Sequence, residues 1–241
     1  MMAQDTQDDV ILVRHLTKKY GHTVALDDVS LRISRNEGVL IAGPNGSGKS
    51  TLLKALCGIL RPSKVDGLSV FGHDPWRHRH LIFGRMAVAF EDHAFPDFMS
   101  GLDFLTLLAK LRGVDTKGQM IALAERFDLI PFWDRPMRGY SSGMRRKMAL
   151  AQALLGDPEL VLLDEPLVAI DKETRQRLVE RLEDLRRRGV TIVISSHLLF
   201  GLEKVASRFV VMINGRIAFD SPLEPQPGWL DATYGRIVGE S

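Results

Sequence analysis

Short apolar runs, each bounded by Gly, Asp, Asn or Pro, predict β-strands in the first third of the chain. These runs cover residues 10–15, 24–33, 39–42 and 68–71. Their lengths and their flanking turn residues are typical of strands. The chain is therefore predicted to open with sheet.

A helical pattern replaces the strand pattern from Gly101 onward. Apolar side chains recur there at intervals of three and four residues and stop at Gly113. The same character continues over residues 116–127 and 142–155. The middle of the chain is therefore predicted to be helical.

After the helical middle, short strands alternate with helix again. The predicted strands are 160–163, 190–195 and 209–213. Between them, the spacing predicts a helix over 172–188, which begins after Asp171, a good N-cap, and ends before Gly189. Strand, helix and strand in succession predict an α/β core with a parallel sheet, into which the helical segment 96–149 is inserted.

Composition and charge exclude several classes of protein. The chain has 241 residues, 45% apolar and 26% charged, and 32 Lys and Arg against 30 Asp and Glu give a net charge of +2. Such a chain is not disordered, and it lacks the basic excess of nucleic-acid binders, so no nucleic-acid partner is expected.

Its one cysteine, Cys57, lies in an apolar stretch and indicates a reducing compartment. No run approaches the ~18 apolar residues of a membrane span, and the N-terminus is unlike a secretory signal, so a cytosolic chain is expected.

A glycine-rich segment follows the strand at 39–42 and precedes a helix that starts near Thr51. Its residues are Gly43, Pro44, Asn45, Gly46, Ser47, Gly48, Lys49 and Ser50, which fit the pattern G-x-x-x-x-G-K-[ST]. Glycines let backbone amides surround phosphate groups, and the helix N-terminus adds its positive end. Lys49 is expected to contact the β- and γ-phosphates of a nucleotide, and the Ser50 hydroxyl to ligate Mg²⁺. A glycine-rich turn that matches by accident is the alternative, and the flanking strand and helix argue against it.

Two carboxylates, Asp164 and Glu165, end the apolar strand at 160–163 and precede Pro166. An isolated acidic pair is costly to bury unless it serves a cation or a water. Asp164 suits the Mg²⁺ shell, and Glu165 suits polarisation of an attacking water. Taken alone the pair is a common strand exit, but behind a phosphate loop it indicates nucleotide hydrolysis.

The segment Tyr140-Ser141-Ser142-Gly143-Met144, followed by a helical run, resembles the signature segment of ATP-binding cassette (ABC) ATPases. The resemblance covers nearly the whole chain. The motifs also have the family's order: phosphate loop, helical insertion, signature, acidic strand end, a loop ending at Asp171, and a late histidine, His197.

The resemblance implies a particular architecture. The fold would be an α/β P-loop NTPase core with a mostly parallel sheet, an N-terminal antiparallel β region and an inserted α-helical subdomain. All 241 residues would form one ABC ATPase domain. Its parts would be a nucleotide-binding core at 1–95 and 150–220, a helical signature subdomain at 96–149 and a C-terminal tail at 221–241. The chain would then hold only one of the two ATP-binding halves.

The resemblance also implies roles for residues and partners. Two cassettes, as a homodimer, would pair head to tail, and the signature of one would cover ATP bound to residues 43–51 of the other. The signature residues are Ser141, Ser142, Gly143 and Met144. His197 would contact the γ-phosphate and help to hold the attacking water, and Asp171 would end the loop that crosses the dimer interface. Tyr20 matches the aromatic residue that stacks on adenine, with a plain turn tyrosine as the alternative. A separate integral-membrane permease would hold the dimer at the cytoplasmic face of the membrane.

Two positions depart from the common family pattern. Glu91 stands where many cassettes carry a glutamine, and Ser142 stands where many signatures carry their first glycine. Glutamate can still ligate Mg²⁺ through oxygen, which makes Ser50, Glu91 and Asp164 the expected metal ligands, although it adds charge near the phosphates. Both departures are similar to an exporter branch with separate permease chains, which includes drug, sodium and haem-type exporters.

Other functions stay open beside this interpretation. A non-transport cassette would be favoured by long coiled coils or a second phosphate loop, and the sequence has neither. A weakly hydrolysing regulatory module is suggested by Glu91 and Ser142, while Glu165 and His197 argue against it. A small GTPase is disfavoured because no Asn-Lys-x-Asp motif is present. The transported substrate does not follow from the sequence.

Two further clusters invite other functions. Three histidines near Trp76, namely His73, His78 and His80, suggest a metal site, but their spacing fits no structural zinc pattern. The basic run 145–147 after the signature could mimic a nucleic-acid patch. We expect these three basic residues to line the solvated side of the signature helix instead.

Overall fold

The strands form two sheets of different character. The computed structural model describes residues 8–113, 117–199 and 201–239. A three-stranded antiparallel sheet has the order β2-β1-β4, and a six-stranded sheet has the order β5-β6-β7-β3-β8-β9. The bounds of the smaller sheet's strands are β1 Asp9–Tyr20, β2 Thr23–Ser34 and β4 Gly67–Val70.

The six-stranded sheet is parallel except for its last strand, β9, which is antiparallel to β8. Its strands are β3 Gly38–Ala42, β5 Met86–Ala89, β6 Leu160–Asp164, β7 Thr191–Ser195, β8 Arg208–Ile213 and β9 Arg216–Pro222. A mostly parallel sheet beside an N-terminal antiparallel one confirms the predicted fold class.

The central strands β3, β6 and β7 are buried along their whole length. Their side chains alternate between two hydrophobic clusters, so that Leu40 and Leu163 lie in one cluster while Ile41 and Leu162 lie in the other. Helices and the smaller sheet cover the two faces, which explains why these strands are continuous apolar runs rather than alternating ones.

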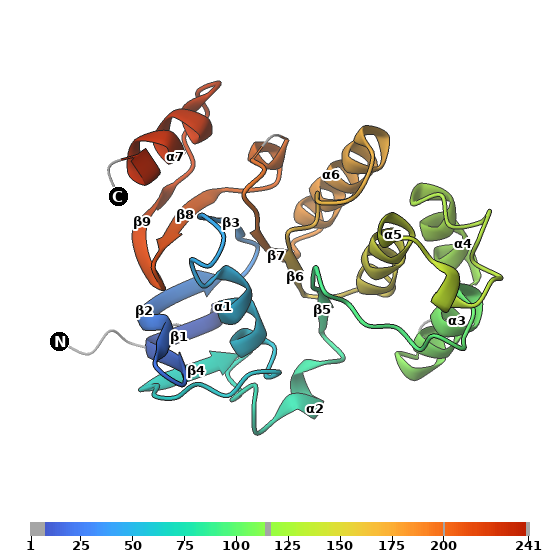
Figure 1. Cartoon of the computed structure of the whole chain (residues 1–241), viewed down its shortest axis with the longest axis horizontal. Helices are drawn as coiled ribbons and strands as arrows, with labels where there is room; N and C mark the ends of the chain where they lie inside the picture. The colour runs from blue at the N-terminus through green and yellow to red at the C-terminus, as the bar shows by residue number, and fades with distance from the viewer. Residues whose placement is uncertain (1–7, 114–116, 200, 240–241) are drawn as a thin grey trace.

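Seven α-helices surround the sheets in the described part of the chain (Figure 1). They are α1 Lys49–Leu56, α2 Arg79–Ile82, α3 Gly101–Leu111, α4 Lys117–Arg126, α5 Ser142–Ala153, α6 Lys172–Arg187 and α7 Trp229–Gly239. Short 3-10 turns occur at Met137–Gly139 and Leu202–Lys204. Helices α3, α4 and α5 gather at one end of the molecule, opposite the smaller sheet (Figure 1). No helix in the described ranges is long and apolar enough to span a membrane.

The predicted elements occur with small shifts at their ends. Helix α5 ends at Ala153 and β9 ends at Pro222, so the expected divisions at 149/150 and 220/221 fall inside elements. The division into subdomains stays a prediction. Thr116, the first residue of one predicted helix, lies outside the described residues. Strands β5 and β9 were not predicted; β9 alternates between half-buried and exposed residues, which is a weak signal.

The C-terminal helix α7 packs on the core through an aromatic cluster. The ring of Trp229 lies 5.9 Å from that of Phe209 in β8 and 6.4 Å from that of Phe219 in β9, measured between centroids. This aromatic cluster covers the edge of the larger sheet beside β9.

Candidate functional site

The glycine-rich loop joins the end of β3 to the start of α1, and its shape requires glycine at two positions. At Gly43 (φ +154°) a Cβ atom would lie 2.2 Å from the carbonyl oxygen of Met212. At Gly48 (φ +103°) it would lie 2.6 Å from the carbonyl oxygen of Ala25. Gly46 also has a positive φ of +81°, but no atom lies within 4 Å of its Cβ position. Backbone carbonyl groups of β8 and β2 therefore lie too close to the loop for a side chain at Gly43 or Gly48, while the Cβ position of Gly46 faces open space.

Lys49 begins α1, and its ammonium group lies inside the loop. The side chain is 5% exposed. Its Nζ donates hydrogen bonds to the carbonyl oxygens of Gly43 at 2.7 Å and Pro44 at 3.2 Å, and it lies 3.6 Å from Oε1 of Glu165. The buried hydroxyl of Ser47 has no hydrogen-bond partner among the described residues. A cation, the positive end of α1 and an unpaired hydroxyl thus meet at one loop, which favours an anionic ligand.

Asp164 and Glu165 lie at the end of β6, next to the end of β7. Both are buried. The hydroxyl of Ser195 donates a short hydrogen bond to Oδ1 of Asp164. Glu165 has a left-handed backbone (φ +49°), and its N–H donates to the carbonyl oxygen of Ser195 at 2.9 Å. Left-handed backbone is unfavourable for a residue with a Cβ, so the surrounding contacts must hold Glu165 in this turn.

The carboxylate of Glu165 lies between Lys49 and His197. Its Oε2 accepts from the backbone N–H of His197 at 3.1 Å and lies 2.9 Å from His197 Nδ1. Its Oε1 faces Lys49 and has no hydrogen-bond partner among the residues that the structure describes. The structure thus brings together three site residues predicted from distant parts of the sequence. A buried carboxylate oxygen without a donor is able to accept a proton from a water.

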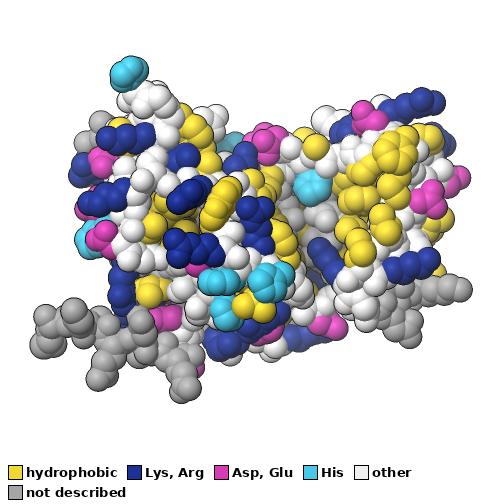
Figure 2. All heavy atoms as spheres, turned by 90° about the horizontal axis from the view of Figure 1, so that it is seen from below, with side chains coloured by type: hydrophobic (Ala, Val, Ile, Leu, Met, Phe, Trp, Pro, Cys, Tyr) yellow, Lys and Arg dark blue, Asp and Glu magenta, His cyan; other side chains and the backbone are white. Residues whose placement is uncertain are grey.

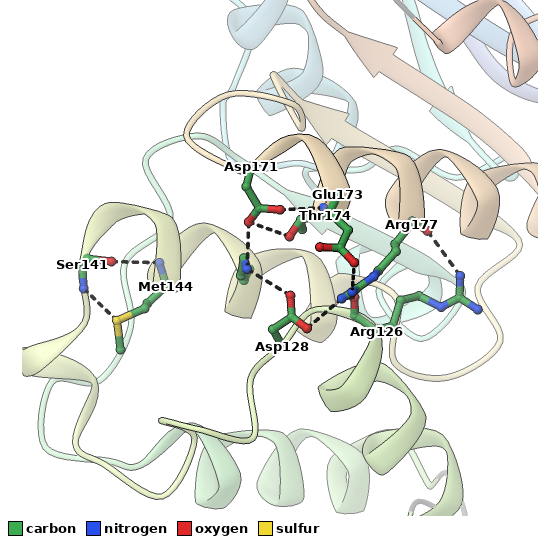
Figure 3. A network of polar contacts seen from close by, with 9 residues as sticks. Arg126, Asp128, Ser141, Met144, Asp171, Glu173, Thr174 and Arg177 are labelled. Carbon is green, nitrogen blue, oxygen red and sulfur yellow. Dashed lines mark hydrogen bonds and ion pairs between the residues drawn. The ribbon is translucent and has the colours of Figure 1, made fainter.

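The signature segment forms the N-terminus of α5 and faces outward. The hydroxyl of Ser141 accepts from the backbone N–H of Met144 at 3.2 Å, and the Ser141 N–H donates to the Met144 sulfur at 3.5 Å (Figure 3). Ser141 and Ser142 are exposed. Within the described ranges, no hydrogen bond or ion pair joins residues 141–144 to residues 43–51. The signature therefore makes no polar contact with the loop of its own chain.

Asp171 is the N-cap of α6 and is linked by an ion pair to the signature helix α5 (Figure 3). It accepts from the backbone N–H and the hydroxyl of Thr174, each at 2.8 Å. Lys147 of α5 lies 3.0 Å from Asp171 and 3.3 Å from Asp128, which in turn pairs with Arg177 at 2.7 Å. The N–H of Thr174 and the ammonium of Lys147 lower the pKa of the Asp171 carboxyl. Lys147 thus links Asp171, which ends the predicted interface loop, to α5 and to Asp128 after α4.

Comparison with known proteins identifies the family. A family model described as ABC transporter matches residues 26–168. The chain belongs to the ABC transporter family. An uncharacterised ABC transporter ATP-binding protein from Nostoc is 35% identical over 206 residues, which is 83% of this chain and 61% of that protein. A daunorubicin resistance ATP-binding protein from Streptomyces coeruleorubidus is 32% identical over 213 residues, 87% of this chain and 67% of that protein. The chain thus spans less than two thirds of the Nostoc protein.

A solved structure has the same fold as this ABC family member. It is an ATP-binding subunit of an ABC transporter, 25% identical to this chain, with a TM-score of 0.84. The match covers 95% of this chain and 99% of the solved one. The fold of the ABC chain is therefore shared over nearly its whole length.

Two predicted site residues of this ABC chain stand apart from the others. Tyr20, at the end of β1, is 51% exposed, and Lys18 Nζ lies 5.0 Å from its ring centroid. Glu91 directly follows Phe90 and is exposed. Neither side chain forms a hydrogen bond with residues 43–51 in the described part of the chain. Their roles in nucleotide stacking and in Mg²⁺ binding stay predictions, as do those of Ser50 and Thr51 in the first turn of α1.

The expectation that the basic run 145–147 lines a solvated face is wrong for Arg146. Its side chain is 3% exposed, and it donates to the carbonyl oxygens of Phe90 at 2.7 Å and Asp164 at 2.5 Å. Helical spacing does not separate Arg146 from its neighbour Lys147, because both precede buried apolar residues three, four and seven positions later; the contacts of α5 with the strand ends decide which of the two is buried. The run was interpreted as one unit, although adjacent helical residues point in different directions.

The histidine cluster forms a ring contact. The rings of His73 and His78 lie 6.2 Å apart in an edge-on arrangement. In the described ranges, no group of three or more His, Cys, Asp or Glu residues is arranged to hold a metal ion. The described residues thus place no third metal ligand beside His73 and His78.

Proposed function

We propose that this chain is an ATP-binding and ATP-hydrolysing subunit of an ABC transporter, which dimerises on ATP and powers a separate membrane permease. The observation that carries this proposal is the row formed by Lys49, Glu165 and His197 beside the phosphate loop. Family membership and the similarity to proteins named as ATP-binding support the choice of nucleotide.

Hydrolysis would rest on position and electrostatics. Lys49 would neutralise phosphate charge once a nucleotide replaces the loop carbonyls as its partner. Glu165 would accept a proton from the attacking water through Oε1, while His197 holds Oε2 on the other side. Because Glu165 is buried beside a cation, its orientation is fixed before the nucleotide arrives.

The donor set fits Mg²⁺. A hydroxyl at Ser50 and carboxylates at Asp164 and Glu91 are hard oxygen ligands, which Mg²⁺ prefers. The buried Oε1 of Glu165 without a hydrogen-bond partner is further evidence that this strand end serves a cation or a water. Bound Mg²⁺ would neutralise charge on the β- and γ-phosphates.

A dimer would complete the site. Ser141 and Ser142 are exposed at the positive end of α5, and the signature makes no polar contact with its own loop among the described residues. These donors would therefore act on ATP held by a second copy of the chain. Asp171 and the loop before it would lie at the same interface, because a Cβ atom at Gly143 would be only 3.1 Å from the carbonyl oxygen of Ala169.

The permease would dock on the helical end of the molecule, at the cytoplasmic face of the membrane. Apolar side chains gather on the side of this end that Figure 2 shows. In and before α3, Phe98 is 82% exposed, Leu111 is 73% exposed and Leu107 is 44% exposed. Exposed apolar groups of this kind mark interaction sites. Similarity to a daunorubicin resistance protein supports export as the direction of transport.

ATPase assays test the hydrolytic part of this proposal. We expect Glu165→Gln to lower kcat about 100-fold or more while ATP still binds, and Lys49→Ala to weaken ATP binding. Glu125→Gln, which changes an exposed acid on α4, is the matched control and should hydrolyse ATP like the wild type. Wild-type turnover in Glu165→Gln would refute the proposed catalytic site.

A weakly hydrolysing regulatory module, suggested by Glu91 and Ser142, is the alternative function. It would show slow single-turnover hydrolysis in the wild type itself.

Mixing two inactive variants tests the shared site. Lys49→Ala damages the loop, and Ser142→Glu places a carboxylate where the partner's phosphates would lie, at a position that suits a helix N-terminus. A mixed dimer has one intact site, built from the loop of one chain and the signature of the other. We expect ATPase activity to return on mixing. If each chain used its own signature, no activity would return.

A further inference from the structure

Arg146 is a buried cation that makes no direct ion pair in the described structure. Its Nη1 donates to the carbonyl oxygen of Phe90 and its Nη2 to that of Asp164, while its Nε has no hydrogen-bond partner among the described residues. Burying a guanidinium is costly, and burial lowers its pKa. An arginine remains charged at neutral pH nonetheless. A charge kept in this position therefore calls for a role that an apolar residue could not fill.

The two carbonyl groups that Arg146 holds have one feature in common. Each belongs to the peptide bond directly before a glutamate of the proposed site, since Glu91 follows Phe90 and Glu165 follows Asp164. These peptide groups lie at the ends of β5 and β6, which are neighbouring parallel strands. One planar guanidinium thus fixes the peptide groups from which both acidic side chains depart.

Electrostatics strengthens this arrangement. The charges of Asp164, Glu91 and Glu165 all favour the charged form of Arg146, against the burial that disfavours it. A second contact, from the Gln152 side chain to the carbonyl oxygen of Val88 at 3.0 Å, also ties α5 to β5. Among the described residues, no other side chain of α5 donates a hydrogen bond to the end of β6, so Arg146 makes the one such bond between the signature helix and the strand end that carries Glu165.

We propose that Arg146 is a positioning residue, which orients Glu91 and Glu165 through the peptide groups before them and makes both follow movements of the signature helix. The inference rests on the proposed function. Because α5 carries the signature at its first turn, contact with a second cassette or a permease would reach both glutamates through the Arg146 side chain. In this role Arg146 would act through the peptide groups and not by contact with the nucleotide.

The test compares two neighbouring arginines of α5. Arg146→Met keeps the apolar part of the side chain and removes the guanidinium group. Arg145→Met removes an ion pair at the surface, in which the guanidinium lies 3.0 Å from the carboxylate of Asp97. We expect Arg146→Met to lower kcat about 10- to 100-fold, as small misplacements of catalytic groups do, with ATP affinity within about twofold of wild type. Arg145→Met should keep wild-type kcat. Circular dichroism and melting curves establish that each variant is folded.

A conservative variant covers the case in which Arg146→Met does not fold. Arg146→Lys keeps the charge but replaces the planar guanidinium with a compact ammonium on a shorter side chain, which does not reproduce the geometry of the two hydrogen bonds. We expect lowered kcat at unchanged ATP affinity for the folded Lys variant too. Wild-type kcat in either folded variant would overturn the inference, and so would a raised KM with unchanged kcat, because that result indicates a role in binding only.

A double-mutant cycle with Glu91→Gln provides a readout that general destabilisation would not move. If Arg146 positions Glu91, the factor by which Glu91→Gln changes kcat should shrink to less than about twofold in the Arg146→Met chain. Equal factors in both backgrounds would overturn the inference. Wild-type turnover is measured in the same series. An inactive wild type would refute the proposed function, whereas an active wild type with an equally active Arg146→Met variant would refute only the positioning role.

Discussion

Lys147 lies between two aspartates from different elements, and replacing it tests how far this bridge stabilises the helical end of the molecule. Its Nζ lies 3.0 Å from Asp171 at the start of α6 and 3.3 Å from Asp128 after α4. Lys147→Met removes the charge but keeps most of the apolar stem. The variant therefore isolates the two ion pairs.

The expected loss of stability follows from the exposure of the two aspartates that pair with Lys147. Lys147 is 16% exposed, but Asp128 is 45% and Asp171 is 53% exposed, so water screens both pairs. Exposed pairs contribute about 0.2–1 kcal/mol each. Lys147→Met should therefore lower the free energy of unfolding by about 1 kcal/mol, which shifts Tm by about 2–4 °C in a chain of this size.

Thermal melts at low and high salt are the assay. The stability difference between wild type and Lys147→Met should shrink by half or more at 0.5 M salt, because screening weakens exposed pairs. The matched control is Lys110→Met on α3, whose ammonium has no ion-pair partner among the described residues. A loss of about 3 kcal/mol or more, or a difference that salt does not change, would contradict the reasoning. The first result would indicate a desolvated pair, and the second would indicate lost packing instead of lost charge.

Three other substitutions test the loop, the core and the cap. Gly48→Ala should cost about 1–3 kcal/mol and weaken ATP binding, since its Cβ would meet a backbone carbonyl at 2.6 Å; Gly46→Ala, with open space around it, should cost less, and melts with and without ATP compare them. Leu182→Ala should cost about 2–5 kcal/mol in urea unfolding because the side chain is fully buried, while the exposed Arg187→Ala should change little. Asp171→Ala should cost about 1 kcal/mol at pH 7 through loss of the cap. The folded protein lowers the pKa of Asp171, so its stabilisation is full above the ordinary pKa of about 3.9 and declines as pH falls below it; the difference between wild type and variant should narrow only in that acidic range.

Features encoded by neighbouring residues could be predicted from the sequence. The phosphate loop is one contiguous segment, and its glycines are required by the close approach of other strands at Gly43 and Gly48. The buried strands β3, β6 and β7 were predicted because both of their faces are covered, which makes each a continuous apolar run. Strand β9 alternates between half-buried and exposed residues, so its pattern is that of an edge and was missed.

The site itself depends on strand order, which the local pattern does not specify. Glu165 and His197 meet because β6 and β7 are neighbours, with Asp164 paired to Ser195, and Lys49 joins them because β3 is the next strand. Parallel strands bring their carboxyl ends to one edge of the sheet, so residues just after such strands are expected to gather there once the order is known. Family resemblance predicted which residues share the site, and the structure gives the strand order that brings them together.

The partners of the charged residues on α5 could not be predicted from the sequence. Nothing in the sequence connects Lys147 with Asp171, because their contact depends on how α5 packs beside α6. The burial of Arg146 depends on the same packing, because helical spacing does not separate it from Lys147, which also precedes buried apolar residues three, four and seven positions later. A charged residue in such a place must find polar partners inside the protein, and backbone carbonyls at strand ends are the acceptors that a helix packed on a parallel sheet will meet. The structure shows which two peptide groups Arg146 holds, at the ends of β5 and β6.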